Sequence, residues 1–312
     1  MPFFSVIIPL YNKEAFIEQT LKHVLSQSFT DFEIIIVNDG STDGSIEKIN
    51  LLKDNRIRIL HQKNQGVSVA RNKGMELAEG KYFCFLDADD EWTENYLENL
   101  YHTILKFPDA EMYCSRYKTI IGKKKFAYCN LIDLPENYEG FVTDFFKSSI
   151  ISRVAHTSAV AVDRNVFRTI GGFDIEISSG QDLDYWIRIA LRYSVVICKN
   201  ITLIYNYLHY NQSLSKTNIN NKKLPDFEKF AVYEKINPSL KKFLDLYRIE
   251  YALHFHIAGN HKKKEEYLKE TATENIIPKV KFLLSTPPFI LRVFLFIKRY
   301  LKRFGVDFSV YH

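Results

Sequence analysis

Two kinds of hydrophobic pattern alternate along the first ninety residues. Four short runs rich in Val, Ile and aromatic residues occupy 4–9, 33–38, 56–60 and 82–86, and stretches of helical periodicity separate them at 13–26, 44–52 and 67–78. The second and fourth runs are almost continuously hydrophobic, which is typical of strands covered on both faces of a parallel sheet. This alternation predicts a doubly wound α/β fold, with a mainly parallel sheet flanked by helices.

The pattern is less regular beyond residue 90. We expect helices at 94–106 and 182–192, short strands and loops over 110–170, and a mobile loop over the Asn- and Ser-rich segment 206–221. Residues 226–270 look helical, with the polar run 261–266 as a solvated connection. We therefore expect an α/β domain over 1–220 and a helical C-terminal region over 221–312.

Polar residues gather where the predicted strands end. The segment PLYNKE (9–14) follows the first strand, and NDGSTD (38–43) follows the second. Ligands of open α/β sheets bind beyond the carboxyl ends of strands, so both segments should face one crevice. Asp39 is placed to accept hydrogen bonds from a nucleobase or ribose. The alternative is turn and helix-capping chemistry, which suits Ser41, Thr42 and Asp43 better.

Three carboxylates follow the fourth predicted strand, at Asp87, Asp89 and Asp90. Such a cluster is costly unless a cation balances it. Mg²⁺ and Mn²⁺ accept carboxylate oxygens and leave coordination positions open for phosphate. The alternative is an acidic N-cap for the helix at 94–106, which fits Asp90 well.

Two further polar positions fall near the same crevice. Arg71, in ARNKG (70–74), lies between two crevice strands, where its guanidinium suits a nucleotide diphosphate, although a lone helical Arg is commonly solvated or salt-bridged. Gly171 and Gly172 predict a tight turn, and Asp182 then opens a helix. Asp182 is a candidate general base, with helix N-capping as the alternative.

Five segments in this order resemble family 2 glycosyltransferases, over roughly residues 3–215: PLYNKE, VNDGSTD, ARNKG, LDADDEW and GGFD with QDLDYWIR. The resemblance implies a Rossmann-like GT-A fold with a C-terminal helical extension. It also implies that Asp39 reads the base of a uridine-type nucleotide, that Asp89 ligates Mn²⁺ or Mg²⁺ at the diphosphate, and that Asp182 is the catalytic base. The remaining nucleotide-sugar-binding residues would be Pro9, Tyr11, Glu14, Arg71, Asp87 and Ala88.

Two positions near the end of the matched region concern the base and a second metal contact. The family commonly has Glu-Asp at the catalytic base, whereas this chain has Gln181 before Asp182. We expect the replacement of the usual Glu by Gln181 to affect which acceptor the protein uses. His209 resembles a late-loop histidine of the family and is a candidate second metal or phosphate contact, with an ordinary loop histidine as the alternative.

The reaction implied by the resemblance is inverting transfer of a sugar from a UDP-sugar, or a similar nucleotide sugar, to a glycan hydroxyl. The family also implies a lipid-linked acceptor in bacterial surface-polysaccharide assembly. One alternative is a sugar nucleotidyltransferase, although PLYNKE lacks the glycines of a phosphate loop. Another is a non-catalytic nucleotide-sugar-binding subunit, against which the presence of both Asp89 and Asp182 argues.

Positive charge is concentrated at the end of the chain. The formal net charge is +5, and residues 279–312 hold seven Lys or Arg against Asp307 alone. This distribution disfavours a nucleic-acid-binding face on the domain. On a helix over 289–304, one face is mainly apolar (Phe289, Val293, Phe296, Ile297, Tyr300, Leu301 and Phe304) and the cations lie opposite. We expect 287–304 to contact an anionic membrane surface, with packing on the chain's own body as the alternative.

The remaining sequence features concern location. The chain shows no signal-peptide pattern and no run of about 20 apolar residues. Its four cysteines lack metal-site spacing, and a disulfide framework is not expected in a chain of this kind. We therefore expect a cytoplasmic protein that is peripheral to the cytoplasmic face of the inner membrane.

Overall fold

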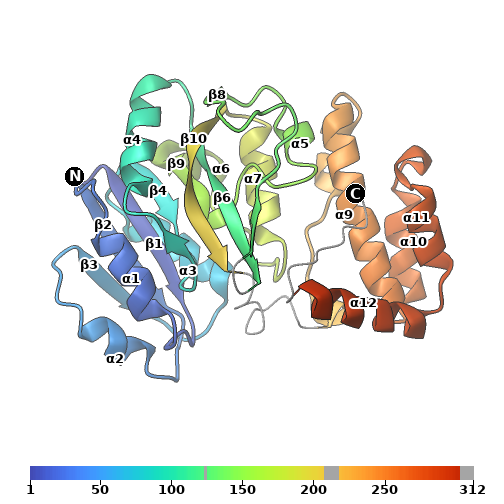
Figure 1. Cartoon of the computed structure of the whole chain (residues 1–312), viewed down its shortest axis with the longest axis horizontal. Helices are drawn as coiled ribbons and strands as arrows, with labels where there is room; N and C mark the ends of the chain where they lie inside the picture. Colours follow the sequence, from blue (N-terminus) through green and yellow to red (C-terminus); the bar gives the residue numbers. More distant parts are fainter. Residues whose placement is uncertain (123–124, 207–217, 303–312) are drawn as a thin grey trace.

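The structure is a computed structural model that describes residues 1–122, 125–206 and 218–302. A sheet with flanking helices makes up one side of the molecule, and the C-terminal helices stand beside it (Figure 1).

The first half of the sheet is parallel, as the sequence predicts. Its strand order is β3-β2-β1-β4, with β1 in the middle and each pair in parallel register. The strands are β1 (Phe4–Leu10), β2 (Phe32–Asn38), β3 (Ile57–His61) and β4 (Tyr82–Phe85). The crossover helices are α1 (Ile17–Leu25), α2 (Ser45–Asn50) and α3 (Val67–Leu77).

The second half of the sheet is mixed. It continues from β4 in the order β9-β6-β10-β5, with β9 antiparallel to both β4 and β6, and β6 parallel to β10. These strands are β5 (Glu91–Trp92), β6 (Met112–Gly122), β9 (Val160–Asp163) and β10 (Val195–Asn206), with β7 (Lys125–Tyr128) and β8 (Gly140–Phe141) paired to β6 and β10. The predicted mixed, mainly parallel sheet is confirmed, but the long strand β10 was not predicted.

Helices complete the described chain. Besides α1, α2 and α3, four further α-helices of the described residues lie before residue 220: α4 (Tyr96–Lys106), α5 (Phe145–Ser148), α6 (Arg164–Ile170) and α7 (Gln181–Ala190). The C-terminal region holds α8 (Ala231–Glu234), α9 (Pro238–Ile257), α10 (His261–Lys269), α11 (Pro278–Ser285) and α12 (Pro288–Lys302). The expected connection at 261–266 is wrong: this run is the start of α10, because the Asn260 side chain accepts from Lys263 N and caps a solvated helix.

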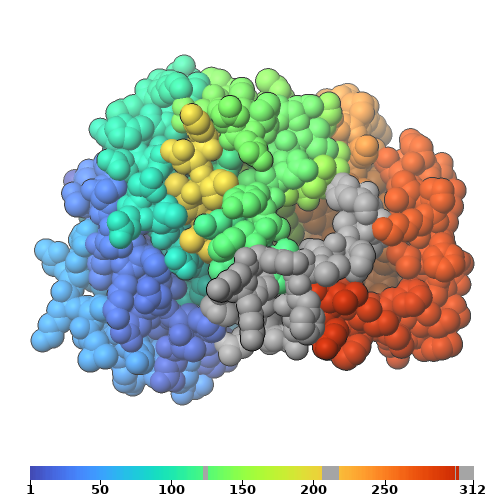
Figure 2. All heavy atoms as spheres, in the orientation of Figure 1, coloured from blue at the N-terminus to red at the C-terminus, as the bar shows by residue number. Residues whose placement is uncertain are grey.

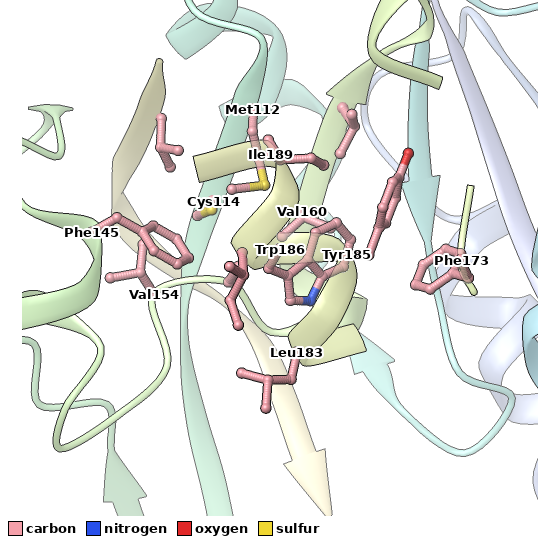
Figure 3. Packing of buried hydrophobic residues seen from close by; sticks show 14 of the residues in the cluster. Met112, Cys114, Phe145, Val154, Val160, Phe173, Leu183, Tyr185, Trp186 and Ile189 are labelled. Atoms are coloured by element: carbon pink, nitrogen blue, oxygen red, sulfur yellow. The ribbon is translucent and has the colours of Figure 1, made fainter. Parts of the chain in front are cut away.

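Strands β1, β2 and β4 bury both of their faces, which explains their almost continuous hydrophobicity. Along β1, Ile7 enters one hydrophobic cluster, and Val6 and Ile8 enter the cluster on the other side of the sheet. The helix α7 packs on the first of these sides, with Leu183, Trp186 and Ile189 among its buried residues (Figure 3).

The cluster that contains Ile7 continues into the C-terminal region. It includes Phe227, Leu240, Phe243 and Phe255, together with strand residues such as Phe85. The C-terminal helices therefore share a core with the sheet, and the domain boundary at 220 stays a prediction. Of the expected loop at 206–221, Asn206 ends β10, residues 207–217 lie outside the described residues, and Ile219–Asn221 form a short 3-10 helix.

Candidate active site

A large cleft of about 1980 Å³ opens where β1, β2 and β4 end, and its far side is formed by the start of α7 and by α9. In the space-filling view, the first strands and helices lie on one side of the molecule and the C-terminal helices lie on the other side (Figure 2). The cleft brings together all of the predicted site residues that the structure describes: Pro9, Tyr11, Glu14, Asp39, Arg71, Asp87, Ala88, Asp89 and Asp182. His209 lies outside the described residues.

Asp39 is buried at the end of β2 and organises the loop that follows β3. Its carboxylate accepts hydrogen bonds from Gln62 Nε2 at 2.6 Å and from the backbone N–H groups of Gln65 and Gly66, each at 2.8 Å. Gly66 has φ +93°, a conformation that favours glycine and that here turns the backbone into α3. Asp39 therefore shapes this wall of the cleft, and its contact with a base stays a prediction.

The loops after β1 and β2 are tied to each other. Asn12 N donates to Ser41 Oγ, and Thr42 N donates to Asn12 Oδ1 at 2.8 Å. Glu14 accepts from Gly44 N at 3.1 Å beside the start of α2. These hydrogen bonds support the interpretation of residues 41–43 as a structural turn. Glu14 also lines the cleft, and its bond to Gly44 N anchors the two loops to each other.

The segments ARNKG and GGFD meet although they are about 100 residues apart. Asn72 pairs with the backbone of Phe173 through two hydrogen bonds of 2.8 Å each. A side chain at Gly172 would clash with Asn72, so this close approach requires glycine. The pairing sets the Phe173 ring 5.2 Å from the Arg71 guanidinium.

Arg71 and Asp87 form a charged pair in the floor of the cleft. The almost fully buried Arg71 donates from Nη2 to Asp87 Oδ1 at 2.5 Å, and the Asp87 side chain is 37% exposed. The backbone N–H of Asp87 donates to Ser158 Oγ, which fixes the turn after β4. Asp87 thus presents one side to Arg71 while part of its carboxylate remains accessible from the cleft.

The other two carboxylates of this turn have different surroundings. Asp89 lines the cleft and pairs with Lys13 Nζ at 2.6 Å. Asp90 is buried and accepts from Ser158 Oγ at 2.6 Å. Burial, together with the negative charge of Asp87, raises the pKa of Asp90 well above its usual value. The N-cap of α4 is Asn95, so the expected capping role of Asp90 is wrong.

The turn after β4 fits a hard divalent cation through its donor chemistry. Two carboxylates, Asp87 and Asp89, lie on the cleft wall, and each is balanced by a cationic side chain of the chain itself. Within the described ranges, no three side chains of His, Cys, Asp or Glu converge to hold a metal ion. A cation here would therefore take two carboxylates from these residues and need further oxygens, such as those of a phosphate.

Asp182 lies across the cleft, in the first turn of α7. The N-cap residue of α7 is Gly180, and Asp182 is not the cap, so the capping alternative is wrong. Arg153 Nη1 donates to Asp182 Oδ2 at 2.9 Å. Burial raises the pKa of Asp182, but the charges of Arg153 and Arg71 outweigh it, and the net pKa is below its usual value. The group is therefore an ionised carboxylate at neutral pH.

Arg153 and His156 line the cleft but were not predicted. Burial is the largest influence on the His156 imidazole and lowers its pKa to about 4, so the ring is neutral at neutral pH. The His156 ring lies 5.1 Å from the rings of both Tyr117 and Tyr205. Neither residue belongs to a motif, and only their place in the loop before β9 could have suggested them.

The nearest acidic neighbour of Asp182 in the sequence has a structural role. Asp184 is fully buried, accepts from Arg188 Nε at 2.9 Å and pairs with Lys229. It does not line the cleft, whereas Gln181, at the position that departs from the resemblance, does. Asp184 is therefore not an alternative base.

The fold and the cleft together define a GT-A type of protein: a Rossmann-like sheet with acidic residues after β4 and a helix-borne aspartate opposite. The model of glycosyl transferase family 2 matches residues 5–171, which is more than half of the chain. The chain belongs to glycosyltransferase family 2.

Relatives of known sequence agree with this assignment. The chain is 30% identical to an uncharacterized glycosyltransferase of Rickettsia prowazekii, over 68% of this chain and 66% of that one. It is 39% identical to the glycosyltransferase GlyG of Streptococcus pneumoniae, over 36% of this chain and 38% of that one. The matched region spans between 26% and 38% of the length of GlyG and three further curated relatives.

Solved structures with the same fold include TarS of S. aureus. Residues 1–349 of TarS in complex with UDP superpose with a TM-score of 0.57 and 18% identity, covering 86% of this chain and 92% of that one. The complex with UDP-GlcNAc gives a TM-score of 0.60 and 18% identity, covering 86% and 93%. At this identity the likeness concerns the fold.

Proposed function

We propose that the protein transfers a sugar from a UDP-sugar, or a similar nucleotide sugar, to a hydroxyl of a glycan acceptor, with inversion at the anomeric carbon. One observation carries the proposal: Asp87 and Asp89 after β4 and the ionised Asp182 on α7 line the same cleft. A single base on the side opposite the leaving group is what a one-step inverting transfer needs.

The donor nucleotide belongs at the ends of β1, β2 and β4. Tyr11 is 45% exposed at the cleft and offers a ring to a base, next to Asp39 and the backbone of Pro9. The UDP and UDP-GlcNAc complexes of TarS, which has the same fold, favour a uridine nucleotide. Arg71 adds positive charge at the floor of the same site, where a diphosphate would lie.

Asp89, with Asp87, would hold Mn²⁺ or Mg²⁺, and His209 remains a candidate further ligand. When bound, the ion would supply Lewis-acid stabilisation of the charge on the departing nucleoside diphosphate. When no cation is bound, the ion pair with Lys13 balances the negative charge of the Asp89 carboxylate.

Asp182 would accept the proton of the attacking hydroxyl. Its lowered pKa keeps it deprotonated before the acceptor arrives. Arg153 orients the carboxylate through Oδ2, which leaves Oδ1 for the acceptor hydroxyl. As the hydroxyl attacks, its proton moves to Asp182 and the bond between the sugar and the diphosphate breaks, so no covalent intermediate forms.

The acceptor would be lipid-linked and reached at a membrane surface. The predicted apolar face of α12 is exposed at Phe289, Val293, Phe296, Ile297 and Tyr300. Leu291 is buried, and Arg292 Nε donates to Ile257 O on α9, so the helix contacts the body with its other side. Leu301 is half-buried, and Arg303 and Phe304 lie outside the described residues.

This arrangement favours the interfacial role over packing of the apolar face on the body. In the part of the chain that the structure describes, no helix combines the length and the hydrophobicity needed to cross a bilayer. We infer from the exposure of its rings that α12 would hold the chain at the cytoplasmic face of the membrane by lying in the headgroup layer.

A panel of nucleotide sugars tests the proposal. We expect one donor, with Mn²⁺ present, to raise the melting temperature and to release nucleoside diphosphate slowly into water. The family assignment leaves the nucleotidyltransferase alternative without support. Donor binding with no release of nucleoside diphosphate, with or without membrane glycolipid extract, would instead favour the non-catalytic binding subunit.

A further inference from the structure

The far wall of the cleft is one face of the helix α9. From Tyr247 to its end, the residues of α9 that are not buried are Tyr247, Glu250, His254 and Ile257, and all four line the cleft. Their spacing of three or four residues places them along one side of the helix. The opposite side, with residues such as Ile249 and Leu253, is buried in the C-terminal bundle.

Packing against the protein core does not explain why the cleft face of α9 carries polar side chains. The side chains of Glu250 and His254 are 52% and 42% exposed and lie 3.9 Å apart, so neither has been drawn into the core. The rings of Tyr247 and Tyr251 flank them on the same helix. Pyranose rings present apolar C–H faces that pack on aromatic rings, and hydroxyls that bond to carboxylate and imidazole groups.

The same face adjoins the candidate base. The Tyr247 ring lies 6.0 Å from the Arg153 guanidinium, which in turn donates to Asp182 at 2.9 Å. A side chain at Gly180, just before α7, would come within 3.0 Å of the Tyr251 hydroxyl, so α9 lies directly against the start of α7. A ligand on α9 would therefore be next to Asp182.

The two sides of the cleft differ in what they can bind. The strand-end side holds Asp39, Arg71, Asp87 and Asp89, whose charges suit a nucleotide diphosphate and a cation. The α9 side carries Glu250 and His254 together with Lys222 and Arg292, so charges of both signs are mixed there. A surface of mixed polar groups with aromatic rings suits a hydroxyl-rich sugar.

We propose that the face of α9 formed by Tyr247, Glu250, Tyr251 and His254 is the acceptor subsite, and that it binds a sugar ring with a hydroxyl directed at Asp182. This inference rests on the proposed glycosyl transfer. Arg292 of α12 lines the same end of the cleft, so the subsite opens next to the helix proposed to lie on the membrane.

Binding of the full-length chain to an array of defined oligosaccharides, with UDP present, tests the subsite. Glu250→Gln and His254→Gln should each weaken the strongest oligosaccharide signals by about tenfold, the effect of losing one good polar contact. The control is Lys242→Gln, because Lys242 is exposed on the same helix but does not line the cleft. A rise in melting temperature with UDP shows that each variant is folded.

The outcomes separate this inference from the proposed function. Equal oligosaccharide binding by the wild type and both cleft variants overturns the subsite, and so does the absence of any signal from the wild type. Release of nucleoside diphosphate by the wild type is a separate test of the transfer reaction. Loss of binding in Glu250→Gln and His254→Gln, with the control unchanged, supports the subsite whatever that second assay shows.

Discussion

Arg153 donates a hydrogen bond of 2.9 Å to Asp182, joining the loop before β9 to the first turn of α7. The partnership contributes to keeping a half-buried carboxylate ionised: burial alone would raise its pKa, and the charges of Arg153 and Arg71 reverse the effect. Because the bond uses one carboxylate oxygen, Arg153 fixes the direction in which the other oxygen faces the cleft. Arg153 is therefore a positioning residue for the proposed base.

Arg153→Gln should move the acid limb of the pH–activity profile to higher pH. Without the guanidinium, burial raises the Asp182 pKa with less opposition, so a smaller fraction is deprotonated at pH 5–6 than in the wild type. The ratio of kcat/KM at pH 6 to that at pH 8 should fall, while Arg168→Gln, on an exposed part of α6, leaves the profile as it was. An equal loss at every pH would mean that Arg153 acts in another way.

Asp182→Asn should lower turnover by about 10²–10⁴, because the amide keeps the shape of the side chain but cannot accept a proton. Single-turnover transfer from the identified donor measures the loss, and calorimetric titration with UDP should show unchanged affinity. Wild-type turnover in this variant would exclude Asp182 as the base, and the buried, ion-paired Asp184 would not replace it.

Asp89→Ala should lower transfer by about 10²- to 10³-fold, because several kcal/mol of charge stabilisation on the diphosphate is lost. The wild type should lose a similar amount in EDTA and regain it with Mn²⁺. Asp109→Ala serves as the control, since Asp109 is exposed and does not line the cleft. Full activity of the wild type in EDTA would contradict a metal at this turn.

Asp39→Ala should affect both stability and nucleotide binding. The loop donors Gln62, Gln65 and Gly66 lose their shared acceptor, which we expect to cost about 1–3 kcal/mol. Urea unfolding measures the change in stability, and UDP titration at a temperature where the variant is folded should show weaker binding. A variant with wild-type stability would mean that water replaces the carboxylate at no cost.

Phe289→Glu combined with Phe296→Glu should abolish binding to vesicles that contain anionic lipid. Both rings are exposed on α12, so the substitutions leave the packing of Leu291 intact. Each basic residue near the surface contributes about 1 kcal/mol, so flotation at low and high salt shows how much attraction is electrostatic. Truncation after Ser285 should have the same effect, and vesicle binding that survives both changes would place the anchor elsewhere.

The sequence by itself determined the parallel half of the sheet and the residues at its edge. Strands β2 and β4 could be predicted because burial on both faces requires unbroken apolar runs, and the chain must place its polar residues where such strands end. Tyr11, Asp39, Asp87 and Asp89 therefore lie at the cleft as expected. The hydrophobic pattern of the strands before these residues is local, so it can be recognised in each segment separately.

Tertiary structure alone decided which distant segments meet. Asn72 pairs with Phe173, and Arg153 pairs with Asp182. The helix α9 turns its polar face toward the cleft. The local pattern of each of these segments does not indicate which other segment it will contact. Asp90 shows the same limit, since it follows Asp89 by one residue but is buried and bonded to Ser158, whereas Asp89 is partly exposed and pairs with Lys13. The hydrophobic pattern fixes which face of an element is buried, whereas the contact across it depends on how all of the elements pack together.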